Sequence, residues 1–540
     1  MEELRLSYSR EGMLPLRFRI GCISTLGLTL ALAAQTEAQT PPQTTSHTSE
    51  LTVNARLVVL DVVATGKNGN AITDLTAADF RVFEDGKPQR IVSFEPPAAH
   101  TLPVSAADAG AATVYDPARP AEFGQSPVTI LVLDQLNTHF ADSSFARRSL
   151  HDYLVKQPAV LAQPTSLLTL YDDNFKLLQQ FTRDRDKLLQ ALAAAPTKFA
   201  WKLEIDGKTE HGPVERLEQS LRDLEEIAQS AARVPGRKNL IWIGGGFPTV
   251  NPTELDTRDA ATVKDTLQHI TDVLLATRVT LYAVDPGSSA AGMTEITDES
   301  QALFADAAGD GLSGSFDPFG ATDDFDRLGP VTGGRVVRGL NDVDHQIAAA
   351  VDVGRSFYTI GYTPSSASES AAAYRKIRVE CVRPGVTLTT RAGYYNEQTQ
   401  QEKTANTAAY DLTAAAESSL PLNGLRVTVA PDSSVAKEAN TYVVRVSAPD
   451  LNWKHEADGT ATASVYVMAV SLNAAGKMQG HVLHGMTATA RPAANLQDES
   501  KTADFSITLQ PSSRAVRLRF VVRDSSTGRM GTVDLPLTKR

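Results

Sequence analysis

Three turns that follow apolar runs in the middle of the chain carry the groups best placed to do chemistry. Asp134 ends the run 128–133, Asp285 ends the run 279–284, and three glycines at 244–246 end a third run. In a doubly wound sheet, ligands bind beyond the carboxyl ends of the strands, where loops and helix N-termini converge. We therefore expect Asp134 and Asp285 to face one crevice, which is the candidate binding site.

The segment after the first run also offers the residue types of a hydrolase. Asp134, His139, Ser143 and Ser144 follow one another within it. A preorganised triad takes its members from separate anchoring points, and one short loop does not supply them. The chain has no Gly-x-Ser-x-Gly elbow, His-Glu-x-x-His helix or Walker loop. We expect no enzymatic activity, and a hydrolase that uses the crevice is the alternative.

The elements that must position these residues alternate between strands and helices. Short apolar runs and amphipathic segments alternate over 127–397, which is typical of βαβ units on a mostly parallel sheet. We expect a hairpin around 172–174 and helices over 145–156, 184–195, 217–231, 263–277 and 343–354. This pattern predicts a doubly wound, Rossmann-like α/β domain, with a Gly-, Ser- and Asp-rich insertion at 287–329.

Strand patterns with turn residues between them flank this central domain. Alternating residues predict a small β-domain at 51–97, and regular short strands predict an antiparallel β-sandwich at 416–540. Polar, Pro-, Ala- or Thr-rich segments predict linkers at 39–50, 98–126 and 398–415.

The N-terminal residues have the order of a secretory signal peptide. Several arginines precede the apolar run 20–34, and small residues follow it up to Ala38. We expect residues 1–38 to be removed and the protein to be exported, either to the periplasm or outside the cell. Removal takes Cys22 with it and leaves Cys381 alone, so we expect no internal disulfide in the mature chain. We also expect no integral membrane segment after cleavage, because no other apolar run is long enough to span a bilayer.

Composition argues against one large class of partner. The 540 residues include 63 acidic and 52 basic side chains, which gives a net charge of -11. Such a charge repels nucleic-acid phosphates, so we expect no nucleic-acid partner.

Five stretches of this chain resemble the von Willebrand factor type A (VWA) domain, and more closely the secreted VWFA-related family described from Acidobacteria. They are VTILVLDQLNT, LLTLYDDNFKLLQQFTRDRDKLLQAL, VPGRKNLIWIGGGF, VTLYAVDPG and, upstream of these, LTAADFRVFEDGKPQRIVSF. The resemblance covers residues 51–395 and leaves the last domain unassigned. It implies a protein that binds another protein or a cell-surface ligand.

The resemblance also implies a metal site. VWA domains typically hold Mg²⁺ at an adhesion site built from an Asp-x-Ser-x-Ser loop, a distant Thr and a distant Asp. In this chain Asp134 and Thr138 match the loop, and Thr209 is the candidate for the distant Thr. Carboxylate, hydroxyl and water oxygens suit Mg²⁺ at about 2.1 Å.

This motif is degenerate here. Leu136 stands where the loop has its middle Ser, and Gly244 stands where the distant Asp is expected. Asn137 and Asp285 are the possible substitutes. The alternative is that Asp134 caps the following helix or accepts hydrogen bonds from loop amides. The protein would then be a metal-free structural or assembly module of an envelope complex.

Overall fold

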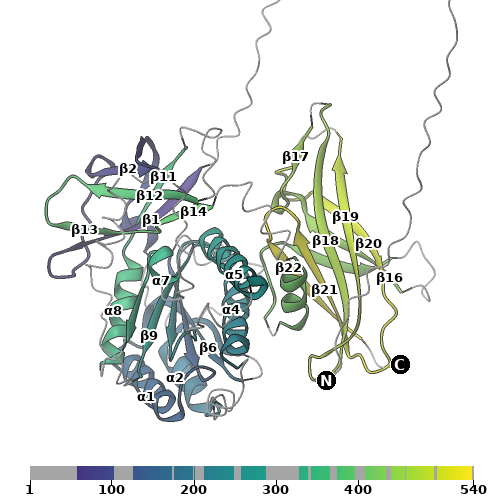
Figure 1. Ribbon diagram of the computed structural model, residues 1–540, viewed down its shortest axis with the longest axis horizontal. Helices are drawn as coiled ribbons and strands as arrows, with labels where there is room; N and C mark the ends of the chain where they lie inside the picture. Colours follow the sequence, from purple (N-terminus) through teal and green to yellow (C-terminus); the bar gives the residue numbers. More distant parts are fainter. Residues whose placement is uncertain are drawn as a thin grey trace, which may run out of the picture. The chain divides into compact units, whose positions relative to one another are not determined.

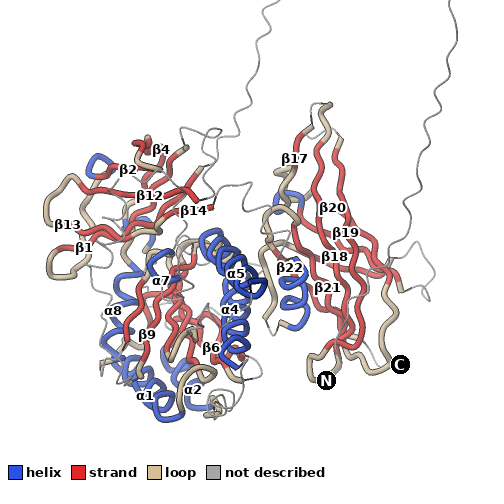
Figure 2. The backbone as a smooth tube through the Cα atoms, in the orientation of Figure 1, coloured by secondary structure: helices blue, strands red, loops and turns tan. Residues whose placement is uncertain are grey.

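The computed structural model of this chain has a mixed α/β fold, as predicted from the sequence (Figures 1 and 2). It describes residues 57–101, 126–172, 175–198, 200, 212–248, 257–287, 328–338, 342–364, 374–395, 408–418, 420–432, 440–456, 458–491 and 496–537. The signal peptide, Thr209 and nearly all of the 287–329 insertion lie outside these residues. Within them, no helix is both long enough and apolar enough to cross a membrane.

A six-stranded sheet forms the centre of the fold. Its strands are β5 (Val128–Asp134), β6 (Val160–Leu170), β7 (Phe175–Asp184), β8 (Lys238–Ile243), β9 (Val279–Asp285) and β10 (Arg335–Arg338). The order is β10-β9-β8-β5-β6-β7, and every pair is parallel except β6 with β7. Numbered along the chain, this is the 3-2-1-4-5-6 order of doubly wound folds. The expected hairpin around 172–174 is the β6–β7 pair.

Helices cover both faces of this sheet (Figure 1). They are α1 (Phe140–Lys156), α2 (Arg185–Ala194), α4 (Gly212–Ser230), α5 (Thr257–Ala276) and α8 (Val343–Arg355), with a single turn at α7 (Leu328–Val331). One apolar cluster joins the sheet to α4 and α5, and a second joins its other face to α1, α2 and α8. Helix α2 begins where the sequence predicted, because the Asp184 carboxylate accepts the N–H groups of Asp186 and Lys187 at 3.0 and 3.2 Å.

The N-terminal strands do not form a domain of their own. They are β1 (Val58–Gly66), β2 (Phe80–Glu84), β3 (Lys87–Gln89) and β4 (Ile91–Glu95), and they pair with β11 (Tyr358–Tyr362), β12 (Tyr374–Cys381), β13 (Val386–Thr389) and β14 (Gly393–Tyr395). The two resulting sheets are β13-β1-β11-β4 and β14-β12-β2-β3. The predicted division into 51–97 and 127–397 therefore has to be corrected, because residues 358–395 complete the N-terminal sheets instead of extending the central one.

A buried carboxylate connects these two parts of the chain. Glu84 on β2 is 3 % exposed and accepts the hydroxyl hydrogens of Tyr362 at 2.6 Å and Tyr394 at 2.9 Å. A buried charge needs such donors to replace water. Glu84 therefore depends on residues that follow it by more than 270 positions.

The C-terminal part is an antiparallel two-sheet unit preceded by a helix. One sheet holds β15 (Val427–Pro431), β16 (Thr441–Ser447) and β20 (Thr502–Thr508), and the other holds β17 (Lys454–His455), β18 (Ala461–Leu472), β19 (Met478–Ala490), β21 (Arg517–Asp524) and β22 (Met530–Pro536). Apolar side chains from both sheets share one core. Residues 408–417 form a helix, which corrects the predicted linker 398–415, and its buried Leu412, Ala415 and Ala416 pack against the β18–β21 sheet.

We expect Tyr362→Phe to destabilise the protein by about 1–3 kcal/mol, because it removes one donor from a buried carboxylate. Urea unfolding followed by circular dichroism measures the change. Tyr466→Phe is the matched control, since Tyr466 is only partly buried and lies on β18. Equal losses in both variants would contradict the proposed role of Glu84.

A second prediction concerns Lys238, which is 2 % exposed at the start of β8. Burial, together with the charge of Arg278, lowers the pKa of Lys238 to about 7. From pH 7 to pH 10 the unfolded chain binds a proton that the folded chain has released, so this residue makes stability rise with pH. We expect Lys238→Met to be more stable than the wild type at pH 7, with an advantage that shrinks towards pH 10.

Urea unfolding at pH 7, 8.5 and 10 tests this. The exposed Lys477 provides the control, and we expect Lys477→Met to differ from the wild type by the same amount at each pH. An advantage of Lys238→Met that stays constant with pH would count against the lowered pKa.

Candidate functional site

The structure places the three candidate turns at one edge of the central sheet. Residue pairing is continuous across the three strands, with Leu133 opposite Ile243 and Ile243 opposite Val284. All three strands end at these pairs or one residue after them, so Asp134 and Asp285 lie at the same edge of the sheet, as expected. The chain reverses its winding between β5 and β8, where doubly wound folds form their crevice.

Asp134 is fully buried and is held by donors from two loops. Its Oδ1 accepts the backbone N–H groups of Leu136 at 2.8 Å and Asn137 at 3.0 Å. Its Oδ2 accepts the indole N–H of Trp242 at 3.0 Å. Burial raises the pKa of Asp134, and these hydrogen bonds offset only part of that shift. The carboxylate therefore binds loop amides, which is the alternative to metal binding that the sequence left open.

Two glycines bring the loop after β8 against the loop after β5. A Cβ on Gly244 would lie 2.4 Å from Thr138 Oγ1 and 2.6 Å from Asp134 Cβ, and Gly244 has a φ of 148°. A Cβ on Gly245 would lie 2.0 Å from the carbonyl oxygen of Asn137. No side chain fits at position 244, so the glycine that replaces the expected Asp is required by this packing.

The other candidate ligands are also engaged. Thr138 Oγ1 accepts the N–H of Gly245 at 2.8 Å, and Asn137 Nδ2 donates to Ser220 Oγ on α4 at 2.8 Å. Thr209 lies outside the described residues. The described part of this donor set does not fit Mg²⁺, because the oxygens of Asp134 and Thr138 already face N–H donors, which repel a cation.

Asp285 is held separately from Asp134. Its Oδ1 accepts the N–H of Gly287 at 2.8 Å, and its Oδ2 lies 3.1 Å from Arg338 Nη1. Burial raises the pKa of Asp285, while the Gly287 amide and Arg338 act in the opposite direction. The two acidic residues share an edge, but each has its own partners.

Very little space remains between these groups. The hollow lined by residues 244–247, Asp285 and Arg338 measures about 10 Å³. That volume is close to the least that holds one water molecule, and small-ligand sites measure about 300–1,000 Å³. Among the described residues, this edge offers a closed surface instead of a substrate crevice.

The two serines of the alternative hydrolase lie in the first turn of helix α1. Ser143 is buried, and its backbone N–H donates to the carbonyl of His139. Ser144 Oγ donates to the carbonyl of Phe140 at 2.9 Å, which is a local helix bond. These contacts build the first turn of α1.

Exposed aromatic side chains border the closed edge. Helix α1 begins directly after the Asp134 loop, and its Phe140 and Phe145 are 47 % and 36 % exposed. Exposed Phe residues beside a rigid loop are the kind of group that protein interfaces use.

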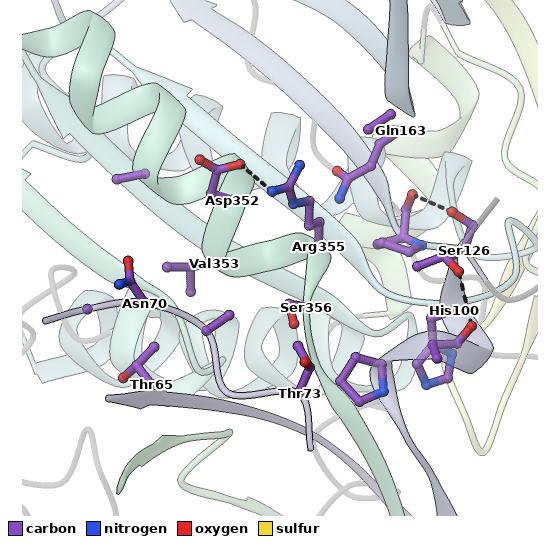
Figure 3. Close-up of a pocket in the computed structure, with 18 residues that line it drawn as sticks. Thr65, Asn70, Thr73, His100, Ser126, Gln163, Asp352, Val353, Arg355 and Ser356 are labelled. Carbon is purple, nitrogen blue, oxygen red and sulfur yellow. Dashed lines mark hydrogen bonds and ion pairs between the residues drawn. The ribbon is translucent and has the colours of Figure 1, made fainter. Parts of the chain in front are cut away.

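A larger hollow lies at the other end of the sheet, and the sequence analysis did not predict it. It measures about 760 Å³ and takes its walls from segments near 65–73, 97–101, 126–127, 162–163 and 349–356 (Figure 3). Gln163 on β6 is 5 % exposed and accepts the hydroxyl hydrogen of Thr129 at 2.8 Å. His100 stacks on Phe357 with ring centroids 4.4 Å apart. Only the nonlocal pairing of β1 and β11 brings these segments together.

The fold and this edge define the class as a doubly wound α/β protein with closed loops at its switch point. No protein-family model and no curated protein matches the chain. Among solved structures, the SpRpn10 VWA domain is 17 % identical, with 29 % of this chain and 74 % of that one covered at a TM-score of 0.18. The endonuclease/exonuclease/phosphatase of Beutenbergia cavernae is 12 % identical, with 34 % and 38 % covered at a TM-score of 0.09. The first is a VWA domain, the class that the sequence resembles, but TM-scores this low establish neither a family nor an activity.

We expect Asp134→Ala to destabilise the protein by about 2–5 kcal/mol, because it leaves three buried donors without an acceptor. Asp152→Ala on α1 is the control, since that carboxylate is 48 % exposed and its loss should cost under about 0.5 kcal/mol. Urea unfolding measures both.

We also expect millimolar Mg²⁺ to leave the melting temperature of the wild type unchanged, because the oxygens of Asp134 and Thr138 already accept hydrogen bonds. A rise in melting temperature that Asp134→Ala abolishes would instead support the metal site.

Proposed function

We propose that this protein is an exported, non-enzymatic binding module that docks another protein on the closed edge of its central sheet. Export is inferred from the basic residues and the apolar run 20–34 of the N-terminal segment. The observation that carries the docking proposal is that both carboxylate oxygens of Asp134 accept hydrogen bonds. Its two oxygens face donors from both loops, so the edge is fixed before any partner arrives.

Preorganisation makes such an edge suitable for protein binding. Asp134 binds Trp242 on strand β8, and Thr138 binds Gly245 in the loop after β8. A surface that is already ordered loses less conformational entropy when it binds, and this favours affinity.

The chemistry of the edge favours a protein partner over a small molecule. The hollow of about 10 Å³ is too small for a substrate. Phe140 and Phe145 offer exposed apolar surface on the first turns of α1, which follows the Asp134 loop, and aromatic side chains commonly contribute most of the binding energy at interfaces. The partner we propose presents an apolar patch to the start of α1.

The engagement of Asp134 also favours the metal-free version of this function. A VWA-like adhesion site would bind a carboxylate of its partner through the metal, whereas the oxygens of Asp134 and Thr138 here already accept N–H groups. The docking contact is therefore apolar, and we expect it to be insensitive to metal chelators.

A pull-down from envelope and secreted fractions tests the proposal. We expect the double variant Phe140→Ser, Phe145→Ser to lose at least about tenfold of the recovered partner, since two buried aromatic contacts each contribute about 1 kcal/mol or more. Leu483→Ser is the matched control, because Leu483 is 44 % exposed on β19 of the C-terminal unit.

Two results would contradict the function. Equal recovery of the partner by the double variant and the control would contradict docking at this edge. Turnover of ester, peptide or glycoside probes that disappears in His139→Ala would establish the hydrolase instead.

A further inference from the structure

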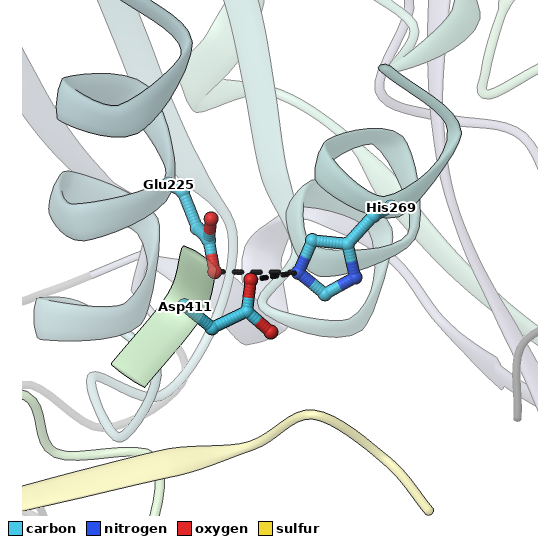
Figure 4. Close-up of side chains that lie close together, drawn as sticks. All are labelled: Glu225, His269 and Asp411. Carbon is cyan, nitrogen blue, oxygen red and sulfur yellow. Dashed lines mark hydrogen bonds and ion pairs between the residues drawn. The ribbon is translucent and has the colours of Figure 1, made fainter. Parts of the chain in front are cut away.

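Three ionisable side chains from distant segments meet in a buried cluster that the closed edge does not use. They are Glu225 on α4, His269 on α5 and Asp411 in the 408–417 helix (Figure 4). One ligand atom of each lies within 4.8 Å of the other two. Their exposed fractions are 2 %, 2 % and 0 %. Two carboxylates and an imidazole have thus been removed from water at one point.

The distances in this cluster suit a metal ion better than a hydrogen bond. His269 Nε2 lies 3.3 Å from Glu225 Oε1 and 3.4 Å from Asp411 Oδ1. Both distances exceed the usual 2.7–3.2 Å or so of an N–H···O bond, and one N–H shared between two acceptors makes two weak bonds instead of one strong one. Around a tetrahedral Zn²⁺ with bonds of about 2.0–2.1 Å, neighbouring ligand atoms lie about 3.3 Å apart.

The charges in the cluster favour a cation at its centre. The Glu225 and Asp411 carboxylates both face His269 Nε2, and the Arg523 guanidinium pairs with the far oxygen of Asp411 only. The two carboxylates therefore favour positive charge beside Nε2. A proton on His269 supplies one positive charge and lies on one side of the cluster. A divalent ion supplies two positive charges and contacts all three side chains.

One oxygen atom has no partner in the absence of such an ion. Glu225 Oε2 is buried and makes no hydrogen bond to the described residues. Buried oxygens without a partner are rare in native proteins, and a bound ion is one of their ordinary explanations. With both oxygens on a metal, Glu225 would complete four-coordination around it.

The neighbouring arginine holds Asp411 as an outer-shell partner would. Arg523 Nε and Nη2 lie 2.7 and 2.5 Å from Asp411 Oδ2. This pair fixes the carboxylate and directs Oδ1 towards His269. Such contacts from a second layer of residues commonly orient metal ligands.

We propose that Glu225, His269 and Asp411 bind one Zn²⁺, which fastens α4 and α5 to the helix that leads into the C-terminal sheets. An imidazole with two carboxylates suits Zn²⁺, whereas Mg²⁺ and Ca²⁺ prefer oxygen ligands alone. The complete burial of the ligands makes this a structural ion without an open position for a substrate.

Metal binding to the tag-free full-length chain tests the site. After treatment with a chelator and dialysis, we expect the wild type to bind one equivalent of Zn²⁺ by calorimetry and to melt at a higher temperature with the metal. Glu225→Gln and His269→Gln should each weaken binding at least tenfold. His151→Gln is the control, because His151 is 56 % exposed on α1 and should leave binding unchanged.

Co²⁺ gives a readout that does not depend on the variants folding. We expect the wild-type chain to bind one equivalent with the intense visible absorption of tetrahedral Co²⁺, and Zn²⁺ to displace it. A wild type that binds neither metal stoichiometrically, or a folded His269→Gln that binds Zn²⁺ as tightly as the wild type, would overturn the proposal. The cluster would then be a proton-bridged network of ion pairs. The docking edge contains none of these residues, so its test is independent.

Discussion

The buried carboxylate of Asp134 is the constraint on which the strand-end edge depends. A carboxylate without solvent contact must receive hydrogen bonds, and its donors come from its own loop and from Trp242 of the neighbouring strand. To supply them, the loop after β8 approaches until its backbone touches the loop after β5. That approach requires glycine at 244 and 245 and leaves a hollow of only about 10 Å³. The edge is therefore closed because the buried carboxylate of Asp134 needs hydrogen-bond donors.

The parts of the fold that depend on local patterns could be predicted from the sequence. The central strands β5, β8 and β9 are largely apolar runs, because they are buried on both faces. Helix α2 shows a start signal at Asp184, and α4 shows amphipathic spacing. Pairing between distant segments leaves no such local pattern. The β1–β11 and β2–β12 pairs join residues before the central domain to residues after it. The sequence therefore predicted the strands correctly and assigned some of them to the wrong unit.

The candidate site could likewise be predicted only in part from the sequence. The chain pattern was enough to place Asp134 and Asp285 at one edge, because parallel strands end together. The partners of these carboxylates could not be predicted, because Trp242 and Arg338 come from other strands. The cluster of Glu225, His269 and Asp411 was missed because two members lie on amphipathic helices and the third was assigned to a linker. The one available signal was an acidic residue in an Ala-rich segment, 408–417, with helical spacing of its apolar side chains.

Charged pairs recur wherever the chain joins segments that the sequence treats as separate. Arg278, which follows α5, pairs with Asp61 on β1 at 2.5 Å, and Arg233, which follows α4, pairs with Asp450 at 3.1 Å. Apolar cores also cross between sheets, since one cluster joins the two C-terminal sheets and another joins the two N-terminal sheets. A hydrophobic contact tolerates sliding, whereas a buried pair is costly to leave half-made and thus favours one arrangement. In this chain the apolar cores join the sheets and helices, and the ion pairs at the junctions add contacts with a fixed direction.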